Sequence, residues 1–185
     1  MRYALLLSGG VDSSTALAEL AQSGHDVTAY YLKVWLEDEL DYLGQCPWEV
    51  DLSYAREVGE QCGGALGGVP LQLAYPERVV EYTLAELRAG RTPSPDIFCN
   101  QRIKFGAFLD YLERSGVDAD AMIATGHYAR LRREGGHVEL LRSPDPVKDQ
   151  TYFLAHLDQE QLRRIAFPLG SYEKGELRRR AQGYD

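Results

Sequence analysis

The chain has 185 residues and a formal net charge of −8, with 44% apolar and 26% charged residues, a balance that excludes wholesale disorder. No apolar run approaches the roughly 20 residues of a membrane span. The apolar start, Met1 to Leu7, is broken at once by Ser8 and two glycines, so we expect no signal or transit peptide. Three scattered cysteines are too few for a disulfide scaffold or a four-ligand zinc site, and a reducing cytoplasm is the expected location.

Charge is unevenly distributed along the chain. Residues 1–100 carry 6 basic and 15 acidic side chains, whereas residues 101–185 carry 14 and 13. A basic cluster near the end of the chain comprises Arg163, Arg164, Lys174, Arg178, Arg179 and Arg180. Two interpretations stay open: this half meets a nucleic acid, or its charges are ordinary solvated helix faces.

Apolar runs with turn residues between them predict alternating strands and helices. The expected strands cover residues 3–7, 27–34, 69–73 and 121–125. The expected helices cover residues 15–21, 51–62, 76–89 and 99–114, the first of them capped by Asp12, Ser13 or Ser14. Gly-rich breaks precede the third strand, at Gly63-Gly64 and Gly67-Gly68. Two β-like runs around Gly135-Gly136 predict a hairpin, and the chain after Asp149 is expected to be helical.

This alternation predicts an α/β fold, an open and mainly parallel sheet with helices on both faces and a helical extension at the C-terminal end. We expect a first domain over residues 1–145 and a helical segment over 146–185 that begins a second region. In such sheets ligands bind at the carboxyl ends of the strands, where the strand order reverses. The two strings Ser8-Gly9-Gly10 and Thr125-Gly126-His127 each follow a strand directly, so both would lie at that edge.

The segment from Ser8 to Ser14 has the composition of a phosphate-binding loop. Its residues are Ser8, Gly9, Gly10, Val11, Asp12, Ser13 and Ser14. Glycines let the backbone approach a phosphate, serines add hydroxyl donors, and the following helix start adds partial positive charge. Asp12 would repel bare phosphate, so its expected role is capping or holding Mg²⁺. The string is similar to the pyrophosphate-binding loop of the PP-loop ATP pyrophosphatases, and a plain strand-to-helix turn is the alternative.

A second string, Thr92 to Asn100, presents Cys99 near the expected start of a helix. Pro93 and Pro95 stiffen the approach to it, and the residues before each proline are biased away from helix. A helix start would lower the pKa of the Cys99 thiol and raise its thiolate fraction. The alternative is a buried structural cysteine. Cys62 is expected to be structural, and Cys46 is undecided between the two roles.

Two further strings complete the pattern: TGHYAR, with His127 just past a strand, and KDQTYFL, with Lys148, Asp149 and Gln150 at a polar start. Each alone is also consistent with a structural histidine or a surface turn. Together with SGGVDSS and TPSPDIFCN they occur in this order in the tRNA-specific 2-thiouridylases (the MnmA/TrmU family), which the chain resembles over essentially its whole length. Ser94 departs from the Asn that the family usually has there.

The resemblance implies a tRNA-uridine 2-sulfurtransferase that uses ATP and Mg²⁺ to adenylate the C2 oxygen of the wobble uridine, U34, in the tRNA anticodon. Leu32 and Gly126 would line the adenosine site beside the Ser8–Ser14 loop. Cys99 would be catalytic and Asp96 an acid or base. Ser94, Pro95 and Asp96 would contact the flipped base, and His127, Lys148, Asp149 and Gln150 the tRNA.

In this family one cysteine carries a persulfide delivered by sulfur-relay proteins, and the other reduces it to release sulfide or forms a disulfide with it. The second catalytic cysteine of the family lies in a segment beyond residue 185, so the chain is expected to be an N-terminal catalytic region. Two alternatives remain open. One is another PP-loop ATP-dependent ligase or amidotransferase, although no cysteine precedes Cys46. The other is a non-catalytic nucleotide-binding or tRNA-binding module.

Overall fold

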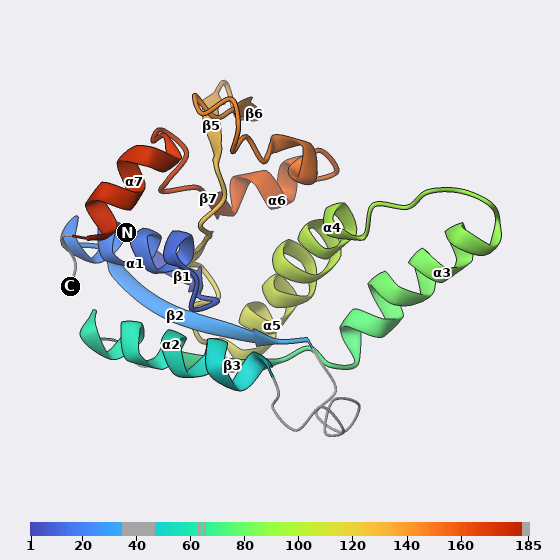
Figure 1. Cartoon of the computed structure of the whole chain (residues 1–185), viewed down its shortest axis with the longest axis horizontal. Coiled ribbons are helices and arrows are strands. Elements are labelled where there is room, and N and C mark those ends of the chain that lie inside the picture. Colours follow the sequence, from blue (N-terminus) through green and yellow to red (C-terminus); the bar gives the residue numbers. More distant parts are fainter. Residues whose placement is uncertain (35–46, 63, 65, 183–185) are drawn as a thin grey trace.

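The computed structural model describes residues 1–34, 47–62, 64 and 66–182. A five-stranded sheet of parallel strands crosses the middle of the molecule in the order β3-β2-β1-β4-β7 (Figure 1). The strands are β1 (Arg2–Leu6), β2 (Asp26–Lys33), β3 (Leu66–Pro70), β4 (Met122–Ala124) and β7 (Ile165–Ala166). The strand order reverses between β1 and β4, which lie side by side. The expected α/β fold is confirmed.

Helical segments connect the strands. They are α1 (Val11–Gln22), α2 (Pro47–Gln61), the π-helical η3 (Pro76–Val80), α3 (Glu81–Arg88), α4 (Pro95–Phe98), the π-helical η4 (Cys99–Ala107), α5 (Phe108–Ser115), the 3₁₀ turn η5 (Thr151–Leu154), α6 (Gln159–Arg163) and α7 (Lys174–Ala181). A separate antiparallel hairpin, β5 (Ala129–Glu134) and β6 (His137–Arg142), turns at Gly135-Gly136 as expected.

Two hydrophobic clusters lie on opposite faces of the sheet, and the alternation of side chains along β1 shows why. Ala4 packs into one cluster, with Ile103 of η4 and Phe108 of α5. Leu5 packs into the other, with Leu17 of α1. Because strands covered on both faces carry apolar residues at every position, the continuous apolar run at the start of the chain correctly predicted a buried central strand.

The third strand was predicted at residues 69–73 but is formed by Leu66–Pro70. Gly67 and Gly68, expected in a break before it, pair with β2. A Cβ atom on Gly67 would lie 2.9 Å from the ring of Tyr30, so the neighbouring aromatic ring occupies the space of a side chain. The glycine pair therefore reflects cross-strand packing and not a loop.

The chain after Asp149 was predicted to be helical, and this is wrong at one place. Ile165 and Ala166 form β7, which pairs in parallel with β4 at the edge of the main sheet. A two-residue strand is too short to show an alternating pattern, so the sequence gives no signal for it. Residues 146–185, expected as a separate helical segment, thus contribute one strand to the sheet of the preceding residues.

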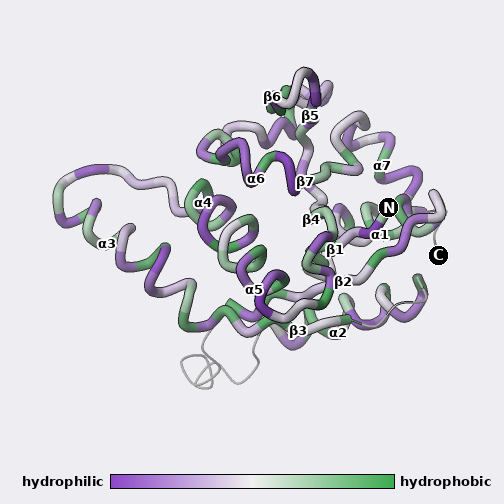
Figure 2. The backbone as a smooth tube through the Cα atoms, turned by 180° about the vertical axis from the view of Figure 1, so that it is seen from behind, coloured by the Kyte–Doolittle hydropathy of each residue, from purple (hydrophilic) through white to green (hydrophobic). Residues whose placement is uncertain are grey.

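α3 lies to one side of the body, away from the sheet, and a loop leads from it back to α4 (Figure 1). No residue of α3 is buried. Leu84 and Leu87 keep 44% and 55% of their surface exposed, and the tube of α3 shows hydrophilic and hydrophobic segments in alternation (Figure 2).

The acidic stretch at residues 37–41 and Cys46 lie outside the described residues. Within the described part of the chain, none of the helices combines the length and the apolar character needed to cross a membrane.

Candidate active site

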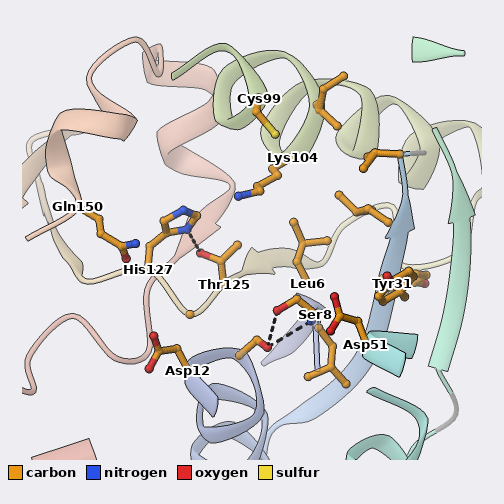
Figure 3. A pocket seen from close by; sticks show the side chains of 17 residues that line it. Leu6, Ser8, Asp12, Tyr31, Asp51, Cys99, Lys104, Thr125, His127 and Gln150 are labelled. Carbon is orange, nitrogen blue, oxygen red and sulfur yellow. Dashed lines mark hydrogen bonds between the residues drawn. The ribbon is translucent and has the colours of Figure 1, made fainter. Parts of the chain in front are cut away.

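A cavity of about 300 Å³ opens at the carboxyl ends of β1 and β4, where the strand order reverses. Ser8, Asp12 and Ser13 line it from the loop after β1, and Thr125, Gly126 and His127 from the loop after β4. Cys99 and Lys104 reach it from η4, opposite the loop (Figure 3). The two strings that follow strands therefore meet, as the topology rule predicted.

The loop wall is organised by Ser13. Its hydroxyl accepts from the Ser8 backbone N–H at 3.2 Å, lies 3.1 Å from the Ser8 hydroxyl and donates to the Gly10 carbonyl at 3.0 Å. The N-cap of α1 is Gly10, and no side chain of the described residues caps this helix. The prediction that Asp12, Ser13 or Ser14 caps it is wrong, because all three lie inside the helix. An uncapped helix start leaves backbone N–H groups available to an anion.

Two glycines allow close backbone approaches at this loop. Gly9 has φ +78°, and a Cβ there would lie 2.5 Å from the Asp51 carbonyl oxygen of α2. A Cβ on Gly126 would lie 2.9 Å from the carbonyl carbon of Asp12 and from the nitrogen of Ser13. Only residues without side chains let these segments close around the start of α1.

The predicted loop residues do not all face one space. Gly9, Val11 and Ser14 line a second hollow of about 670 Å³ between α1 and α2. The Ser14 hydroxyl oxygen is buried and has no hydrogen-bond partner among the described residues. The loop thus separates two hollows, and Ser8, Asp12 and Ser13 are its cavity-facing members.

Asp12 is held by residues far away in the sequence. Its Oδ1 accepts a hydrogen bond from the Tyr128 hydroxyl at 2.9 Å and forms an ion pair with the Lys174 ammonium of α7. Asp145 holds the start of α7, since its carboxylate accepts from the Lys174 backbone N–H at 2.8 Å. No hydrogen bond within the described chain ends on Asp12 Oδ2, which leaves that oxygen open to a cation.

An apolar wall closes the cavity on the side of β2. Leu6, Tyr31, Leu32 and Val34 line it together, so predicted Leu32 lies in the same cavity as predicted Gly126. An apolar wall beside polar loop groups suits a ligand with a flat ring at one end and an anionic group at the other.

Cys99 lines the cavity, but its local environment differs from the prediction. The helical run starts at Pro95, which takes the first helical position, and the Cys99 N–H bonds to the Pro95 and Asp96 carbonyls. The prediction of a lowered thiol pKa is wrong. Burial raises the pKa of Cys99, Lys104 opposes this shift, and Asp96 adds to it. Cys62 and Cys99 are both free thiols.

The proline string lies just outside the cavity. Ser94 precedes α4 as its N-cap residue without a side-chain hydrogen bond, and Pro95 and Asp96 are exposed on the first turn. None of the three lines the cavity. Asp96 is nonetheless close enough to Cys99 to raise the pKa of its thiol by charge repulsion.

His127 is held as a neutral ring. Its Nδ1 lies 2.8 Å from the Thr125 hydroxyl, and the rings of Phe105 and Phe167 lie 6.1 and 6.0 Å from it. Burial, with a smaller contribution from Lys104, lowers the pKa of His127 to about 3. At neutral pH the imidazole therefore offers hydrogen bonds and no charge.

The residues Lys148, Asp149 and Gln150 take three different positions. Lys148 is exposed. The Asp149 carboxylate is engaged within the fold by Arg142 at 2.7 Å and the Thr151 hydroxyl at 2.8 Å. Gln150 lines the cavity, and its Oε1 accepts from the backbone N–H of Tyr128 at 3.0 Å.

Several residues that line the cavity were given no role from the sequence, among them Asp51, Lys104 and Thr125. Thr125 directly follows β4, a position that the topology rule marks as a site edge. Lys104 gave no signal, because a lysine five residues after a cysteine would face elsewhere on an ordinary α-helix. Asp51 gave no signal because it is one of several acidic residues in an amphipathic helix.

Comparison with known proteins gives the family. The family model of the tRNA methyl transferase HUP domain matches residues 1–185. Curated proteins named tRNA-specific 2-thiouridylase MnmA, from two Streptococcus pyogenes strains (serotype M49, NZ131, and serotype M4, MGAS10750), are each 46% identical over 98% of this chain and 48% of their own length. The chain thus spans about half the length of the curated relatives it matches.

Among solved structures, a predicted subunit of a tRNA methyltransferase from Methanocaldococcus jannaschii matches with a TM-score of 0.57 and 17% identity, covering 98% of this chain and 74% of that one. This likeness supports the fold alone. The family model covers the whole chain, and the resemblance to the 2-thiouridylases is confirmed by relatives of 46% identity. The chain belongs to the tRNA methyl transferase HUP domain family and corresponds to the N-terminal part of the tRNA-specific 2-thiouridylases.

Proposed function

We propose that this chain is the ATP-using region of a tRNA-uridine 2-sulfurtransferase, which activates the C2 oxygen of U34 and presents a thiol to the activated carbon. One observation carries the proposal: Cys99 and the Ser8–Ser14 loop, 85 residues or more apart in sequence, line one cavity. Family membership supports it, because an HUP domain implies the use of ATP and the relatives are named for 2-thiouridylation.

ATP would bind with its phosphates at the loop wall. The uncapped start of α1 would supply backbone donors for phosphate oxygens, and the Ser8 hydroxyl would turn from Ser13 to donate as well. The base would lie against the apolar wall at Leu32, with the sugar near Gly126. Backbone donors that the helix holds in place would stabilise departing pyrophosphate, which is how a preformed site lowers a barrier.

Mg²⁺ fits this site as an ion shared between protein and phosphates. The described residues contain no cluster of three or more acidic, histidine or cysteine ligands. Mg²⁺ bound by phosphates requires only one or two carboxylates. Asp12, whose Oδ2 is open, is the residue that would hold it, and the ion would neutralise charge on the phosphates.

Thiolation requires that a carbonyl oxygen become a leaving group. The C2 oxygen of the uridine attacks the α-phosphorus of ATP and releases pyrophosphate. The outer sulfur of a cysteine persulfide then attacks C2, and the bond from C2 to the phosphate-bearing oxygen breaks to release AMP. A second thiol attacks the remaining S–S bond, so the outer sulfur stays on the uridine and the two cysteines are left as a disulfide. Cys99 would work on this carbon, and Asp96, whose charge acts on the Cys99 thiol, would serve as the acid or base. The sulfur would arrive as a persulfide from a donor protein.

The tRNA would approach over the open side of the cavity, in the cytoplasm. The uridine must leave the anticodon stack to reach the cavity. Ser94, Pro95 and Asp96, at the start of the helical run that carries Cys99, would contact the base. His127 and Gln150 would face the nucleotide inside, while Lys148 and the segment 146–185 would meet the tRNA backbone outside.

The reaction is tested by pyrophosphate exchange. With Mg²⁺-ATP and a tRNA that carries U34, the chain should exchange labelled pyrophosphate into ATP, and a tRNA lacking U34 should support none. Equal exchange with small acids or nucleotides in place of tRNA would indicate another PP-loop ligase. ATP binding without any exchange would indicate a non-catalytic module. The full-length protein is the positive control for the assay.

Cys99→Ser tests the role of the thiol. We expect 2-thiouridine formation by the full-length protein to fall at least a hundredfold, because serine cannot carry persulfide sulfur, while ATP affinity changes less than twofold. Mass spectrometry of digested tRNA and equilibrium dialysis measure the two quantities. Cys62→Ser, at the second hollow, is the matched control. A parallel loss of ATP affinity in Cys99→Ser would show that the cysteine is structural.

A further inference from the structure

Lys104 is a cation that faces the cavity, and none of the described carboxylates pairs with it. It reaches the cavity from η4 between Cys99 and His127 (Figure 3) and is half-buried. In the part of the chain that the structure describes, no carboxylate lies within ion-pair distance of its ammonium, whereas the ammonium of Lys174 is already paired with Asp12. A half-buried, unpaired ammonium is costly unless an anion joins it, so the cavity is built to receive one.

The π-helical geometry of η4 explains why Lys104 and Cys99 share the cavity. On an α-helix of 3.6 residues per turn, two residues five apart point about 140° away from each other. In η4 (Cys99–Ala107) hydrogen bonds run from residue i to residue i+5, which brings the fifth residue roughly one turn above the first. The wide turn therefore rotates Lys104 back to the face of Cys99.

The electrostatic environment agrees with this placement. The Lys104 charge lowers the pKa of both Cys99 and His127, so its field reaches both side chains. His127 is neutral at pH 7, and the loop wall contributes backbone dipoles and hydroxyls. Among the described residues that line the cavity, Lys104 thus supplies the full positive charge at the cysteine end.

We propose that Lys104 is a catalytic residue that binds the phosphate of the nucleoside monophosphate formed on the activated carbonyl. This inference rests on the proposed function and assigns the cysteine end of the cavity to that phosphate. When the bond between C2 and its oxygen breaks, the electron pair leaves with the phosphate, and the ammonium stabilises the added negative charge. The ligand class is a nucleoside 5′-monophosphate, for which AMP is the probe.

The test compares AMP with adenosine in equilibrium dialysis. Wild-type chain should bind AMP at least tenfold more tightly than adenosine, as expected for a charge-assisted hydrogen bond. Lys104→Met should abolish this preference while adenosine affinity changes less than twofold, and Lys104→Arg should restore part of it. Arg88→Met, which removes a positive charge from exposed α3, is the control and should keep the full preference.

Three outcomes would overturn the proposal. Wild type could bind AMP no more tightly than adenosine, or Lys104→Met could keep the preference for AMP. In the third outcome, Lys104→Met loses affinity for AMP and for adenosine equally, which would mark Lys104 as structural. The last case is checked by thermal unfolding of the same variants. Pyrophosphate exchange by wild type separates the two claims. If wild type exchanges pyrophosphate and one of these outcomes is seen, only the role of Lys104 is contradicted. If wild type does not exchange pyrophosphate but its preference for AMP depends on Lys104, only the proposed reaction is contradicted.

Discussion

Gly126 shows how one missing side chain sets the width of the cavity. A Cβ there would lie 2.9 Å from backbone atoms of Asp12 and Ser13, and backbone cannot yield as a flexible side chain can. Gly126→Ala should therefore displace the start of α1. We expect a loss of roughly 1–3 kcal/mol of stability and at least tenfold weaker ATP binding, measured by urea unfolding and equilibrium dialysis.

Gly175→Ala is the matched control for this substitution. Gly175 lies in α7, where a Cβ would meet only the tip of Arg179 at 3.9 Å. Alanine there should stabilise the helix by roughly 0.5–1 kcal/mol. Equal behaviour of the two alanine variants would contradict the close approach at Gly126.

His127 predicts a dependence of stability on pH. Its pKa is about 3 in the folded chain, below its ordinary value of 6.5, so the unfolded chain binds more protons between these two pH values. The contribution of His127 to the free energy of unfolding is fully present above about pH 6.5 and is lost as the pH falls toward 3. In urea unfolding between pH 7 and 4, His127→Gln should lose less stability than wild type.

The matched histidine for this experiment is His137, exposed at the start of β6. His137→Gln should follow the wild-type pH profile. If His127→Gln followed it too, the imidazole of His127 would be protonated in the folded protein.

At the residue scale, the sequence predicted which residues line the cavity better than it predicted their pKa values. Ser8, Asp12, Ser13, Leu32, Cys99, Gly126, His127 and Gln150 were all named and all line the cavity. The thiol pKa was wrong, because it was inferred from a helix start whereas burial decides it. Burial depends on which segments cover Cys99, and these are distant in sequence.

The run from Pro95 to Ser115 is the element that carries the cysteine, and its middle is π-helical. The Gln161 side chain supports this stretch, since its Nε2 donates to the Gln101 carbonyl at 2.8 Å and to the Phe105 carbonyl at 3.0 Å. Gln161→Leu should cost roughly 1–3 kcal/mol by leaving these carbonyls without their donor. Thermal unfolding measures it.

The same substitution should also change the chemistry of Cys99. If η4 relaxes toward ordinary α-helix, Lys104 rotates away and the thiol pKa rises further. Cys99 alkylation by iodoacetamide at pH 8 should then slow at least threefold, as followed by mass spectrometry. Gln182→Leu, exposed at the end of α7, should leave both unfolding and alkylation unchanged. If the rate of Cys99 alkylation were unchanged in Gln161→Leu, Gln161 would have no influence on the reactivity of Cys99.

At the element scale, most helices and strands were predictable because apolar periodicity reports which faces are buried. The helix at residues 99–114 was found, but its start at Pro95 and its π-helical turn were not. A proline can open a helix as well as break one, and only the surrounding contacts decide between these. The carbonyls that Gln161 satisfies lie 60 and 56 residues from it in sequence, beyond the reach of any local pattern.

At the scale of the whole molecule, Asp12 and Lys174 join the Ser8–Ser14 loop to α7 across 162 residues. Their side chains are 34% and 19% exposed, so solvent screens the pair only in part. Asp12→Asn and Lys174→Met should each destabilise the chain, and the double variant should lose less than the sum of both. We expect a coupling of roughly 0.5–3 kcal/mol from urea unfolding. Strict additivity would argue against the pair.

The fold class and the meeting point of the two loops were predictable from strand–helix alternation and one topology rule, whereas the two-residue β7 was not. β1 occupies the centre of the sheet and pairs with β2 on one side and with β4 on the other. During synthesis the chain emerges N-terminus first, so the β4 side of this strand stays without a neighbour until more than 120 residues have been made. The nascent chain therefore exposes an open sheet edge at β1 while these residues are being made, and a chaperone would bind at this edge.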